Sequence, residues 1–443
     1  MFKKICLTVA CTLTLAACDM TKVVWAPDAK RAAIIGSDGL RISDEKGTLS
    51  KPVMDQVAKI AWWPDSKQCL VLRSIPAKDW TEIEPILSPD EAKQVRESSE
   101  KLFTEISNFK GTQDELNKKL ENDETIEKNL KAEAVAYLDF THKKELAEKI
   151  PDWNNLPKAQ SYIQVLEKYS AAQDKLSEPV LIRKTMNEIE NIGVSPAGNK
   201  VSFVENIGTD ALYVAAADGS NGHIISGDCN KYPCWSRDGK FIYFIESDGP
   251  TKGFRSATIS SANVNAAQPD KSRRAEAAVS FDASDVVQVN ASGDIIFSNK
   301  KVNFPSVDAP MNLELFIKRK DKDDLEMLTN GDLQKLDVQS FSVSPNGSKI
   351  ALCSKSGATH ILTVENKKVQ TVLSQDNAAG VKFTPNWRSE NQLCLAVKSK
   401  RPGARNDDAE LALINIDDKS IKILSTDWPI SCTNDFLVEK SKN

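Results

Sequence analysis

Alternating apolar and polar positions recur along most of the chain, and each alternating run follows a short turn. The repeated phrase is an apolar or aromatic residue, a Ser-Pro-Asp-Gly-like turn, a basic or polar residue, and apolar residues at every second position. Alternation with period two is typical of a β-strand. Proline presets φ for the first turn position, Asp or Asn tolerates the bend, and glycine takes the left-handed position. The pattern therefore predicts β-hairpins throughout most of the chain.

Seven copies of the phrase occur, some of them degenerate. They read VVWAPDAKRAAII, IAWWPDSKQCLVL, IGVSPAGNKVSFV, PCWSRDGKFIYFI, VQVNASGDIIFSN, FSVSPNGSKIALC and VKFTPNWRSENQLCLAV. Their key apolar positions are Trp25, Trp62, Val194, Trp235, Val289, Val343 and Phe383. Two more strand-like runs follow several copies, which indicates about four antiparallel strands in each unit.

The spacing of the key positions predicts a ring. Neighbouring positions lie 37 to 54 residues apart, except for a gap of 132 after Trp62. Subtracting a polar helical stretch of about 90 residues leaves a period typical of a four-stranded propeller blade. A radial array of small sheets also protects their edges. We therefore predict an all-β fold, a β-propeller with seven blades favoured. Six blades remain an alternative because the copy at Val287 is degenerate, and a stack of unrelated β-sandwich domains is the competing interpretation.

Residues 88–177 differ in composition, because Glu and Lys dominate and Gly111 is the only glycine. The stretch opens with Ser88-Pro89-Asp90-Glu91, which predicts a helix start with a capping box and proline at the first helical position. Apolar residues at helical spacing form three sets: Leu102, Ile106 and Phe109; Ile126, Leu130, Ala134 and Leu138; Tyr162, Leu166, Tyr169 and Leu176. We expect a helical hairpin or small bundle inserted in the second blade.

The helical insertion has two interpretations. Its narrow apolar stripes form the internal seam of a bundle, or its outer face receives a partner protein. In either case an insert on one rim of the ring biases where partners dock. The chain accordingly divides into a signal peptide at 1–17, blade 1 and the start of blade 2 at 18–87, the helical insertion at 88–177, and the rest of blade 2 with the remaining blades at 178–443.

The first eighteen residues predict a cellular address. The basic start MFKK precedes an apolar stretch that is too short to cross a bilayer as a permanent helix. The stretch ends in Leu15-Ala16-Ala17-Cys18, which resembles the bacterial lipobox; an ordinary secretory signal with a chance cysteine is the alternative. The resemblance implies a lipoprotein, with acyl chains such as palmitate on Cys18 anchoring it to the membrane on the periplasmic side. Asp19 resembles the residue type that keeps enterobacterial lipoproteins at the inner membrane.

Six cysteines remain after the signal peptide: Cys69, Cys229, Cys234, Cys353, Cys394 and Cys432. An even number in an oxidising compartment allows three disulfides with fifteen pairings. Cys229 and Cys234 flank a short loop and are the best candidates for one bridge. The alternative for Cys69, Cys353 and Cys394 is that they are buried strand residues that act as small hydrophobes.

The remaining composition excludes several function classes. A net charge of −4 without a long basic run argues against a nucleic-acid binder. The three histidines, His142, His223 and His360, lack a suggestive Ser or Cys partner, and no G-x-S-x-G elbow occurs. Zinc-ligand spacing is also missing, and residues 321–324 (DKDD) are typical of an acidic hairpin tip rather than a calcium loop. We expect no catalytic residue, no cofactor and no metal site, with an ion in the channel as the alternative.

The W-x-P-D and V-S-P-x-G motifs, followed by Lys and alternating apolar residues, resemble the WD40-like repeats of the TolB propeller family. The resemblance covers about three quarters of the mature chain and implies a fold without indicating a partner. The chain departs from the family in two ways. Its first repeat begins at Val23, where TolB has an amino-terminal α/β domain, and TolB has neither a lipid anchor nor a large helical insert. The resemblance implies a TolB-like propeller that is not TolB itself.

Two functions of different classes remain. The first is a non-enzymatic, membrane-tethered interaction scaffold whose helical arm docks a cell-envelope protein, with the tether raising the effective concentration of the complex. The second is a propeller enzyme, or a glycan or small-ligand binder, that works at the central funnel where loops of several blades converge. Acidic residues clustered with His223 at the funnel mouth favour the second function, whereas an apolar or aromatic patch on the arm or rim favours the first.

Overall fold

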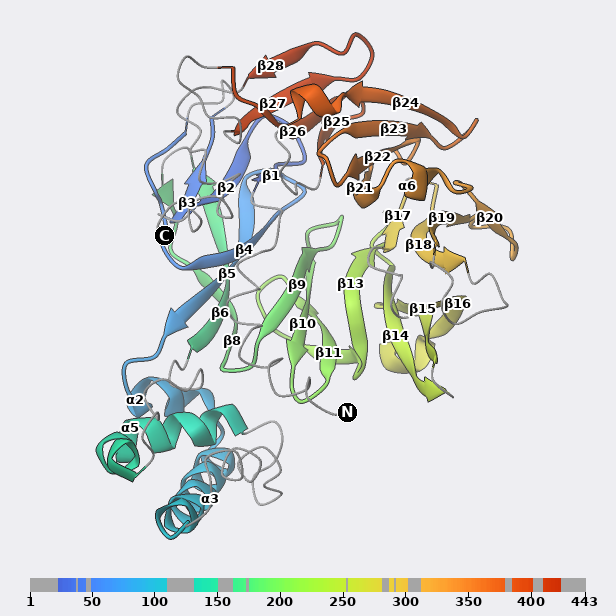
Figure 1. Cartoon of the computed structure of the whole chain (residues 1–443). Coiled ribbons are helices and arrows are strands. Elements are labelled where there is room, and N and C mark those ends of the chain that lie inside the picture. Colours follow the sequence, from blue (N-terminus) through green and yellow to red (C-terminus); the bar gives the residue numbers. More distant parts are fainter. Residues whose placement is uncertain are drawn as a thin grey trace.

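Seven small antiparallel sheets surround a common axis in the computed structural model (Figure 1). The structure describes residues 23–36, 39–44, 49–109, 131–149, 162–172, 175–251, 254–280, 287–290, 292–301, 312–378, 385–400 and 409–423. Within these ranges the sheets have three strands in blade 1, five in blade 2 and four in each of blades 3 to 7. The prediction of a seven-bladed β-propeller is therefore confirmed, and the six-bladed and sandwich interpretations are wrong.

The strands follow the order of the chain, blade by blade. Blade 1 contains β1 (Val23–Trp25), β2 (Ala32–Gly36) and β3 (Gly39–Ile42). Blade 2 contains β4 (Val57–Trp62), β5 (Gln68–Pro76), β6 (Tyr162–Ala172), β7 (Lys175–Leu176) and β8 (Val180–Thr185). Blade 3 contains β9 (Ile189–Val194), β10 (Lys200–Asn206), β11 (Asp210–Ala216) and β12 (His223–Ser226). Blade 4 contains β13 (Cys229–Trp235), β14 (Phe241–Thr251), β15 (Phe254–Asn263) and β16 (Arg274–Ser280).

The last three blades repeat this arrangement. Blade 5 contains β17 (Val287–Val289), β18 (Ile295–Lys301), β19 (Asn312–Lys318) and β20 (Leu325–Met327). Blade 6 contains β21 (Val338–Val343), β22 (Lys349–Ser354), β23 (Thr359–Thr363) and β24 (Lys368–Leu373). Blade 7 contains β25 (Asn386–Ser389), β26 (Gln392–Lys398), β27 (Ala409–Asn415) and β28 (Ile421–Ile423). The helices are α2 (Trp80–Ile83), η2 (Glu84–Ile86), α3 (Pro89–Ser107), α5 (Lys131–Lys149), η6 (Pro269–Ser272), α6 (Asp332–Lys335) and η7 (Gln375–Asn377).

Tryptophan side chains at the key repeat position bond one blade to the preceding one. The indole Nε1 of Trp62 donates to the backbone oxygen of Val24 in blade 1, at 2.8 Å. The indole Nε1 of Trp235 in blade 4 donates to Oγ of Ser202 in blade 3, at 2.9 Å. Each indole also fills the space between two sheets, so the same residue supplies apolar contact and a directed bond.

The key position of the seventh copy is Trp387 and not Phe383, which lies outside the described residues. Trp387 pairs with Leu393 across the first hairpin of blade 7, and its Nε1 donates to the backbone oxygen of Ser342 in blade 6 at 3.1 Å. The Thr-Pro-Asn sequence after Phe383 looks like the repeat turn, but Pro385 lies just before β25. The connecting turn is Glu390–Asn391, which has neither proline nor glycine and so lacks the usual turn signal.

The ring closes between its first and last blades through side chains. All described strands of blade 1 come from the start of the chain and all those of blade 7 from the end, so among the described strands no shared sheet joins the two. Instead, Arg388 donates from Nε to the backbone oxygen of Ala29 at 2.9 Å, and its guanidinium lies 5.0 Å from the ring centroid of Trp25. Val23 and Leu393 are buried in one hydrophobic cluster that spans both blades.

The helical insertion interrupts blade 2 between β5 and β6 and lies outside the ring beside that blade (Figure 1). Its expected third helical set is wrong, because Tyr162, Leu166 and Tyr169 belong to strand β6, which pairs with β5 and with β8. Both faces of β6 are covered, so its apolar residues lack the clean alternation of a half-exposed strand and imitate helical spacing. The described helices of the insertion therefore lie within residues 80–149, and the insertion ends before Tyr162.

Replacing Trp62 with Phe tests the bond between blades 1 and 2. The change leaves the carbonyl oxygen of Val24 without its donor, so we expect a loss of about 1–3 kcal/mol in the free energy of unfolding. Trp80→Phe is the matched control, because Trp80 is also a buried tryptophan, yet its Nε1 has no hydrogen-bond partner among the described residues. Urea unfolding followed by tryptophan fluorescence measures both variants; equal losses would contradict the prediction.

Candidate functional site

The helical insertion is the largest departure from the propeller repeat, and its start matches the sequence prediction. Ser88 caps α3, because its side chain accepts a hydrogen bond from the backbone amide of Glu91 and the Glu91 carboxylate accepts one from the backbone amide of Ser88. Pro89 occupies the first turn. The predicted capping box and proline start are thus confirmed. Gly111, the glycine of this stretch, lies outside the described residues.

The insertion has a core of its own that continues into blade 2. Leu102 and Ile106 of α3 are buried in one cluster with Ala134 and Leu138 of α5, so the internal-seam interpretation is confirmed for these positions. Ile163 of β6 belongs to the same cluster. The two helices are therefore packed on the blade as a continuous body, which we call the arm (residues 78–109 and 131–149).

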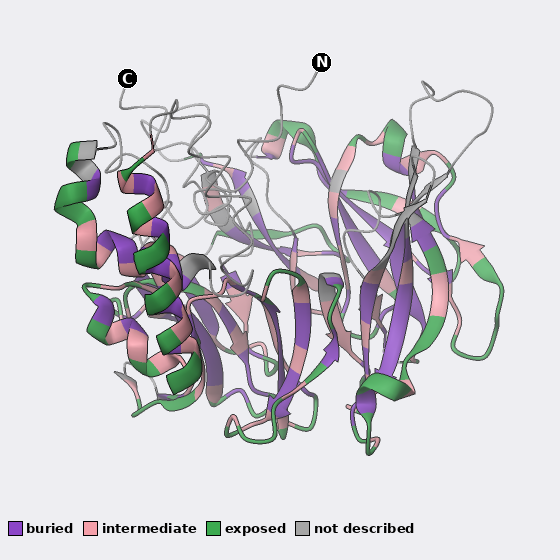
Figure 2. Cartoon of the chain, turned by 90° about the horizontal axis from the view of Figure 1, so that it is seen from below, coloured by how far each residue is buried: buried purple, intermediate pink, exposed green. Residues whose placement is uncertain are grey.

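The outer surface of the arm is charged and carries both signs. Figure 2 shows exposed positions along the sides of the helices that face away from their common core. The exposed charged residues are Asp90, Lys93, Arg96, Glu97, Glu100 and Lys101 on α3 and Lys143, Lys144, Glu145 and Glu148 on α5.

His142 joins the two long helices. Its ring stacks on Phe103 with 3.9 Å between centroids and 13° between planes. Its Nε2 lies 3.0 Å from Oε1 of Glu100, and its Nδ1 lies 3.3 Å from Oε2 of Glu145. The hydroxyl of Tyr137 donates to the same Glu100 oxygen at 3.1 Å. His142 thus has a structural part in the arm, as expected from the sequence.

An ion pair with a buried carboxylate lies where blade 2 meets blade 3. Glu205 of β10 is 0% exposed and accepts two hydrogen bonds from Arg183 of β8, both at 2.9 Å. Thr185 and Asn187 donate to the same carboxylate at 2.9 and 3.0 Å. Burial alone would lower the pKa of Arg183, but the bonds and charge of Glu205 raise it, with a smaller contribution from Glu91 of the arm. Bidentate pairing with full hydrogen bonding is the arrangement in which a buried carboxylate is stable.

Glu133 of α5 is a second buried carboxyl group, but it lacks an arginine partner and full hydrogen bonding among the described residues. It is 3% exposed, and its Oε2 has no hydrogen-bond partner among the described residues. Burial raises the pKa of Glu133 to about 7; a bond from its own backbone amide opposes this shift, and the charges of Glu91 and Glu205 add to it. The arm is therefore attached to the ring beside a carboxyl group that is neutral below about pH 7.

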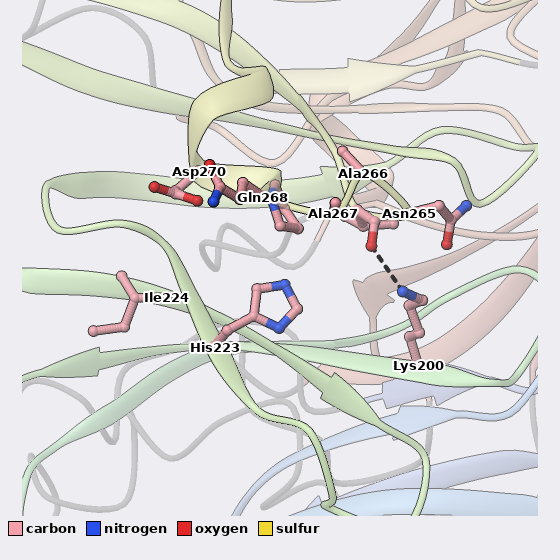
Figure 3. A pocket seen from close by; sticks show the side chains of 10 residues that line it. Lys200, His223, Ile224, Asn265, Ala266, Ala267, Gln268 and Asp270 are labelled. Atoms are coloured by element: carbon pink, nitrogen blue, oxygen red, sulfur yellow. Dashed lines mark hydrogen bonds between the residues drawn. The ribbon is translucent and has the colours of Figure 1, made fainter.

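A second feature is a cleft of about 480 Å³ on the rim between blades 3 and 4 (Figure 3). Lys200 at the start of β10 and His223 and Ile224 at the start of β12 line one side, and residues 264–270, which connect β15 to β16 and include the start of η6, line the other. His223 therefore lies on the outermost strand of its blade. It is not at the funnel mouth, where it would have favoured an enzyme or funnel binder.

Acidic residues do gather at the beginning of blade 3, but without His223. Burial raises the pKa of Glu188 and Asp210, and the charge of Glu190 on the innermost strand β9 raises both further. The remaining histidine, His360, is buried in β23 with its Nδ1 3.0 Å from Oγ1 of Thr371, and burial lowers its pKa. Neither feature assembles a nucleophile and a base.

The predicted disulfide between Cys229 and Cys234 is wrong. The structure has both residues as thiols on the same strand, β13. Their partners on β14, Glu246 and Tyr243, are three residues apart, so the two cysteines are separated by about 10 Å along the strand, more than a disulfide bridges. The loop expected between them is in fact the irregular middle of β13, where the register with β14 shifts twice.

Three other cysteines match the alternative interpretation. Cys69, Cys353 and Cys394 are buried strand residues. Burial raises the pKa of the Cys69 and Cys394 thiols to about 12 in each case. A thiol with so high a pKa is a poor nucleophile, so these side chains act as small hydrophobes.

Several predicted residues lie outside the described part of the chain, namely Cys18, Asp19, Cys432, Ile126 and Leu130. Within the described part, no helix is both long and apolar enough to span a bilayer. The same ranges hold no group of three or more His, Cys, Asp or Glu side chains arranged for a metal ion. Residues 321–324 form the exposed connection between β19 and β20, so the predicted hairpin tip is confirmed.

Sequence reasoning missed the ion pair that joins blade 2 to blade 3. Glu205 interrupts the apolar run VSFV of β10, and Arg183 lies in PVLIRKT, so each is a charge within a predicted strand. Such charges signal a buried pair once the strands are placed in adjacent blades. Lys200 follows its repeat turn as basic residues do in other copies, and nothing in its local sequence distinguishes it.

No family model and no curated protein match the chain. Among solved structures it is similar to TolB from Acinetobacter baumannii, with 16% identity over 59% of this chain and 60% of that chain and a TM-score of 0.40. For the putative TolB from Agrobacterium tumefaciens the identity is 14%, over 56% of this chain and 84% of that chain, with a TM-score of 0.38. For an oligogalacturonate lyase in complex with manganese the identity is 12%, over 78% of this chain and 77% of that chain, with a TM-score of 0.45.

TolB structures are thus among the solved structures to which the chain is similar. The match spans 60% of the Acinetobacter chain. Overlaps this loose carry no information about a ligand, a partner or a reaction.

The raised pKa of Glu133 predicts a pH-dependent stability. The folded state binds more protons than the unfolded state between the ordinary carboxyl pKa of 4.5 and about 7, so stability falls as pH rises through this window. A shift of this size corresponds to a loss on the order of 3 kcal/mol. Glu133→Gln should match the wild type at pH 4 and be the more stable protein at pH 8.

Urea unfolding at pH 4, 6 and 8, followed by circular dichroism, measures this difference. Glu97→Gln is the matched control, because Glu97 is an exposed residue of α3 with 69% of its side chain accessible. If the two glutamine variants show the same dependence on pH, Glu133 is not the source of the effect.

Proposed function

We propose that this chain is a lipid-anchored, extracytoplasmic scaffold in which a rigid, non-catalytic propeller presents the arm to a partner protein. The arm itself is the observation that carries the proposal. It consists of two 19-residue helices, α3 and α5, with a shared core and charged outer faces. A propeller does not need such an insertion to close its ring, because the sheets pack on one another without it.

The topology relates the arm to the proposed anchor. Successive strands of a blade are antiparallel, so the start of a first strand and the end of a second strand lie on the same face of the ring. Val23 starts β1, and Pro76 ends β5 where the arm leaves blade 2. Cys18 precedes Val23 by five residues, which reach at most about 17 Å. A lipid on Cys18 therefore favours an orientation in which the arm side faces the membrane.

This orientation narrows the class of partner. A protein that docks on a membrane-facing arm is itself a membrane protein or a membrane-bound protein of the cell envelope. Tethering both proteins to one surface raises their effective concentration, so a modest interface suffices. Charges of both signs on α3 and α5 favour a partner with a complementary polar surface, where they contribute orientation and association rate more than affinity. The half-buried rings of Phe103, Tyr137 and Phe140 are the apolar part of this surface.

Replacing residues 77–161 with a short turn tests the role of the arm. Pro76 and Tyr162 are direct neighbours across β5 and β6, so a hairpin turn of two to four residues joins them. A deletion of 88–177 would not serve, because it removes β6. The shortened chain should keep the propeller fold and lose proteins that co-purify with the full chain in detergent. An unfolded ring, or a complete set of retained proteins, would refute the docking role.

Charge reversal provides a finer test without deletion. Lys93→Glu with Lys101→Glu changes the outer face of α3, whereas Lys335→Glu with Lys422→Glu changes two exposed lysines of blades 5 and 7. Both pairs alter the net charge equally. Only the α3 pair should weaken co-purification, measured by quantitative mass spectrometry.

Cys18→Ala tests the anchor. Two or three acyl chains contribute about 0.8 kcal/mol per buried methylene, which makes membrane attachment firm. The variant should lose palmitate labelling and leave the membrane fraction. Cys11→Ala, within the apolar stretch of the signal peptide, is the control and should keep both properties. Palmitate labelling that persists in Cys18→Ala would exclude a lipid on this residue.

A further inference from the structure

Two lysines occupy the same position of the repeat turn in different blades. The backbone amide of Lys200 donates to Oγ of Ser195 in blade 3 at 3.0 Å. The backbone amide of Lys349 donates to Oγ of Ser344 in blade 6 at 3.1 Å. Because the turns are equivalent, the two side chains start from the same place in their blades, and differences between them reflect what each one meets.

The two ammonium groups meet different surroundings. Lys349 donates to Oδ1 of Asn391 at 2.7 Å and to the backbone oxygen of Glu390 at 3.3 Å, both in blade 7. Lys200 has one described acceptor, the backbone oxygen of Val264 in blade 4 at 2.8 Å, and it lines the rim cleft (Figure 3). Burial lowers the pKa of Lys200, and no neighbouring charge of the described residues opposes this shift. An ammonium group has three donors, so the cleft holds a cation with hydrogen-bonding capacity to spare.

His223 contributes a hydrogen-bond acceptor, whereas Lys200 contributes donors. Its Nδ1 lies 3.1 Å from the backbone oxygen of Asn221, and a carbonyl oxygen only accepts, so Nδ1 carries the hydrogen. In the neutral ring Nε2 is then an acceptor. That atom is buried and has no hydrogen-bond partner among the described residues. A hydroxyl group of a ligand would supply the missing donor.

The rest of the lining suits a small polar molecule. Asn265 and Gln268 contribute side-chain amides to the wall formed by the β15–β16 connection. The small side chains of Ala266, Ala267 and Pro269 line the same wall. Asp270 lies on the far side of His223 from Lys200 (Figure 3), so the two charges of the cleft stand at different ends. A ligand carboxylate is thereby directed towards Lys200 and away from Asp270.

We infer that the rim cleft between blades 3 and 4 binds a small hydroxylated carboxylate, of the hydroxy-acid or sugar-acid class, with the carboxylate on Lys200 and a hydroxyl on His223. The volume of about 480 Å³ lies in the range of ligand sites. The site is independent of the arm, because it is built from the turns at the opposite end of the strands.

Ligand-observed NMR and titration calorimetry on the purified chain test this site with three probes. D-Glucuronate carries both groups, D-glucose lacks the carboxylate, and propionate lacks the hydroxyls. We expect binding in the order glucuronate, propionate, glucose. Glucose that binds as well as glucuronate would overturn the role of Lys200, and propionate that binds as well would overturn the role of His223.

Substitutions locate the binding. Lys200→Met should weaken glucuronate about tenfold or more, the effect expected for a charge-assisted bond, whereas Lys349→Met at the equivalent turn should have no effect. His223→Phe should remove the preference for glucuronate over propionate. Ala267→Asp places a carboxylate on an exposed loop residue without touching the Lys200 contact and should abolish binding of both acids. Retained binding in Ala267→Asp, or equal losses in the two lysine variants, would show that the cleft is not the site.

Discussion

The whole structure depends on the requirement that each blade be covered on both faces by its neighbours. The second strands show it best: four successive residues of β5, from Cys69 to Leu72, are buried, and five successive residues of β10, from Val201 to Glu205, are buried. An isolated sheet would expose every second residue of these strands. Polar side chains on the second face are thus enclosed as well, and each needs a partner in the adjacent blade. Ser202 accepts a hydrogen bond from the indole N–H of Trp235, and Glu205 accepts hydrogen bonds from the guanidinium of Arg183.

This requirement explains which parts of the fold the sequence predicts. The repeat turn is local, so its Pro, Asp, Asn and Gly residues identify hairpins without knowledge of the neighbours. Blade number follows because seven turns are visible. Errors occur where neighbours decide the outcome. The apolar residues of β6 imitate helical spacing, because both faces of that strand are covered and apolar side chains therefore occur on both. Trp387 was missed because the turn after it lacks proline and glycine.

The candidate site was less predictable than the fold, for a related reason. The start of the insertion is encoded locally in Ser88 and Glu91, and the structure has that capping box. Glu133 and Arg183 are unremarkable in sequence, because only tertiary packing buries Glu133 in the arm and brings Arg183 of β8 onto the buried carboxylate of Glu205. The rim cleft likewise combines a turn residue of one blade with the β15–β16 connection of the next. Such groupings depend on how neighbouring blades are rotated relative to each other, and the sequence of a single repeat does not indicate this rotation.

Strand β10 extends from one of these places to the other. Lys200 at its start lines the cleft, and Glu205 near its end binds Arg183 beside the arm. All seven residues of β10 pair with β11 without a register shift, whereas the pairing of β10 with β9 shifts between Ser202 and Val204. Coupling between distant sites requires an element with two states that both sites bias. The structure has β10 in a single arrangement, and we therefore interpret the arm and the cleft as independent sites that one ring holds at its opposite faces.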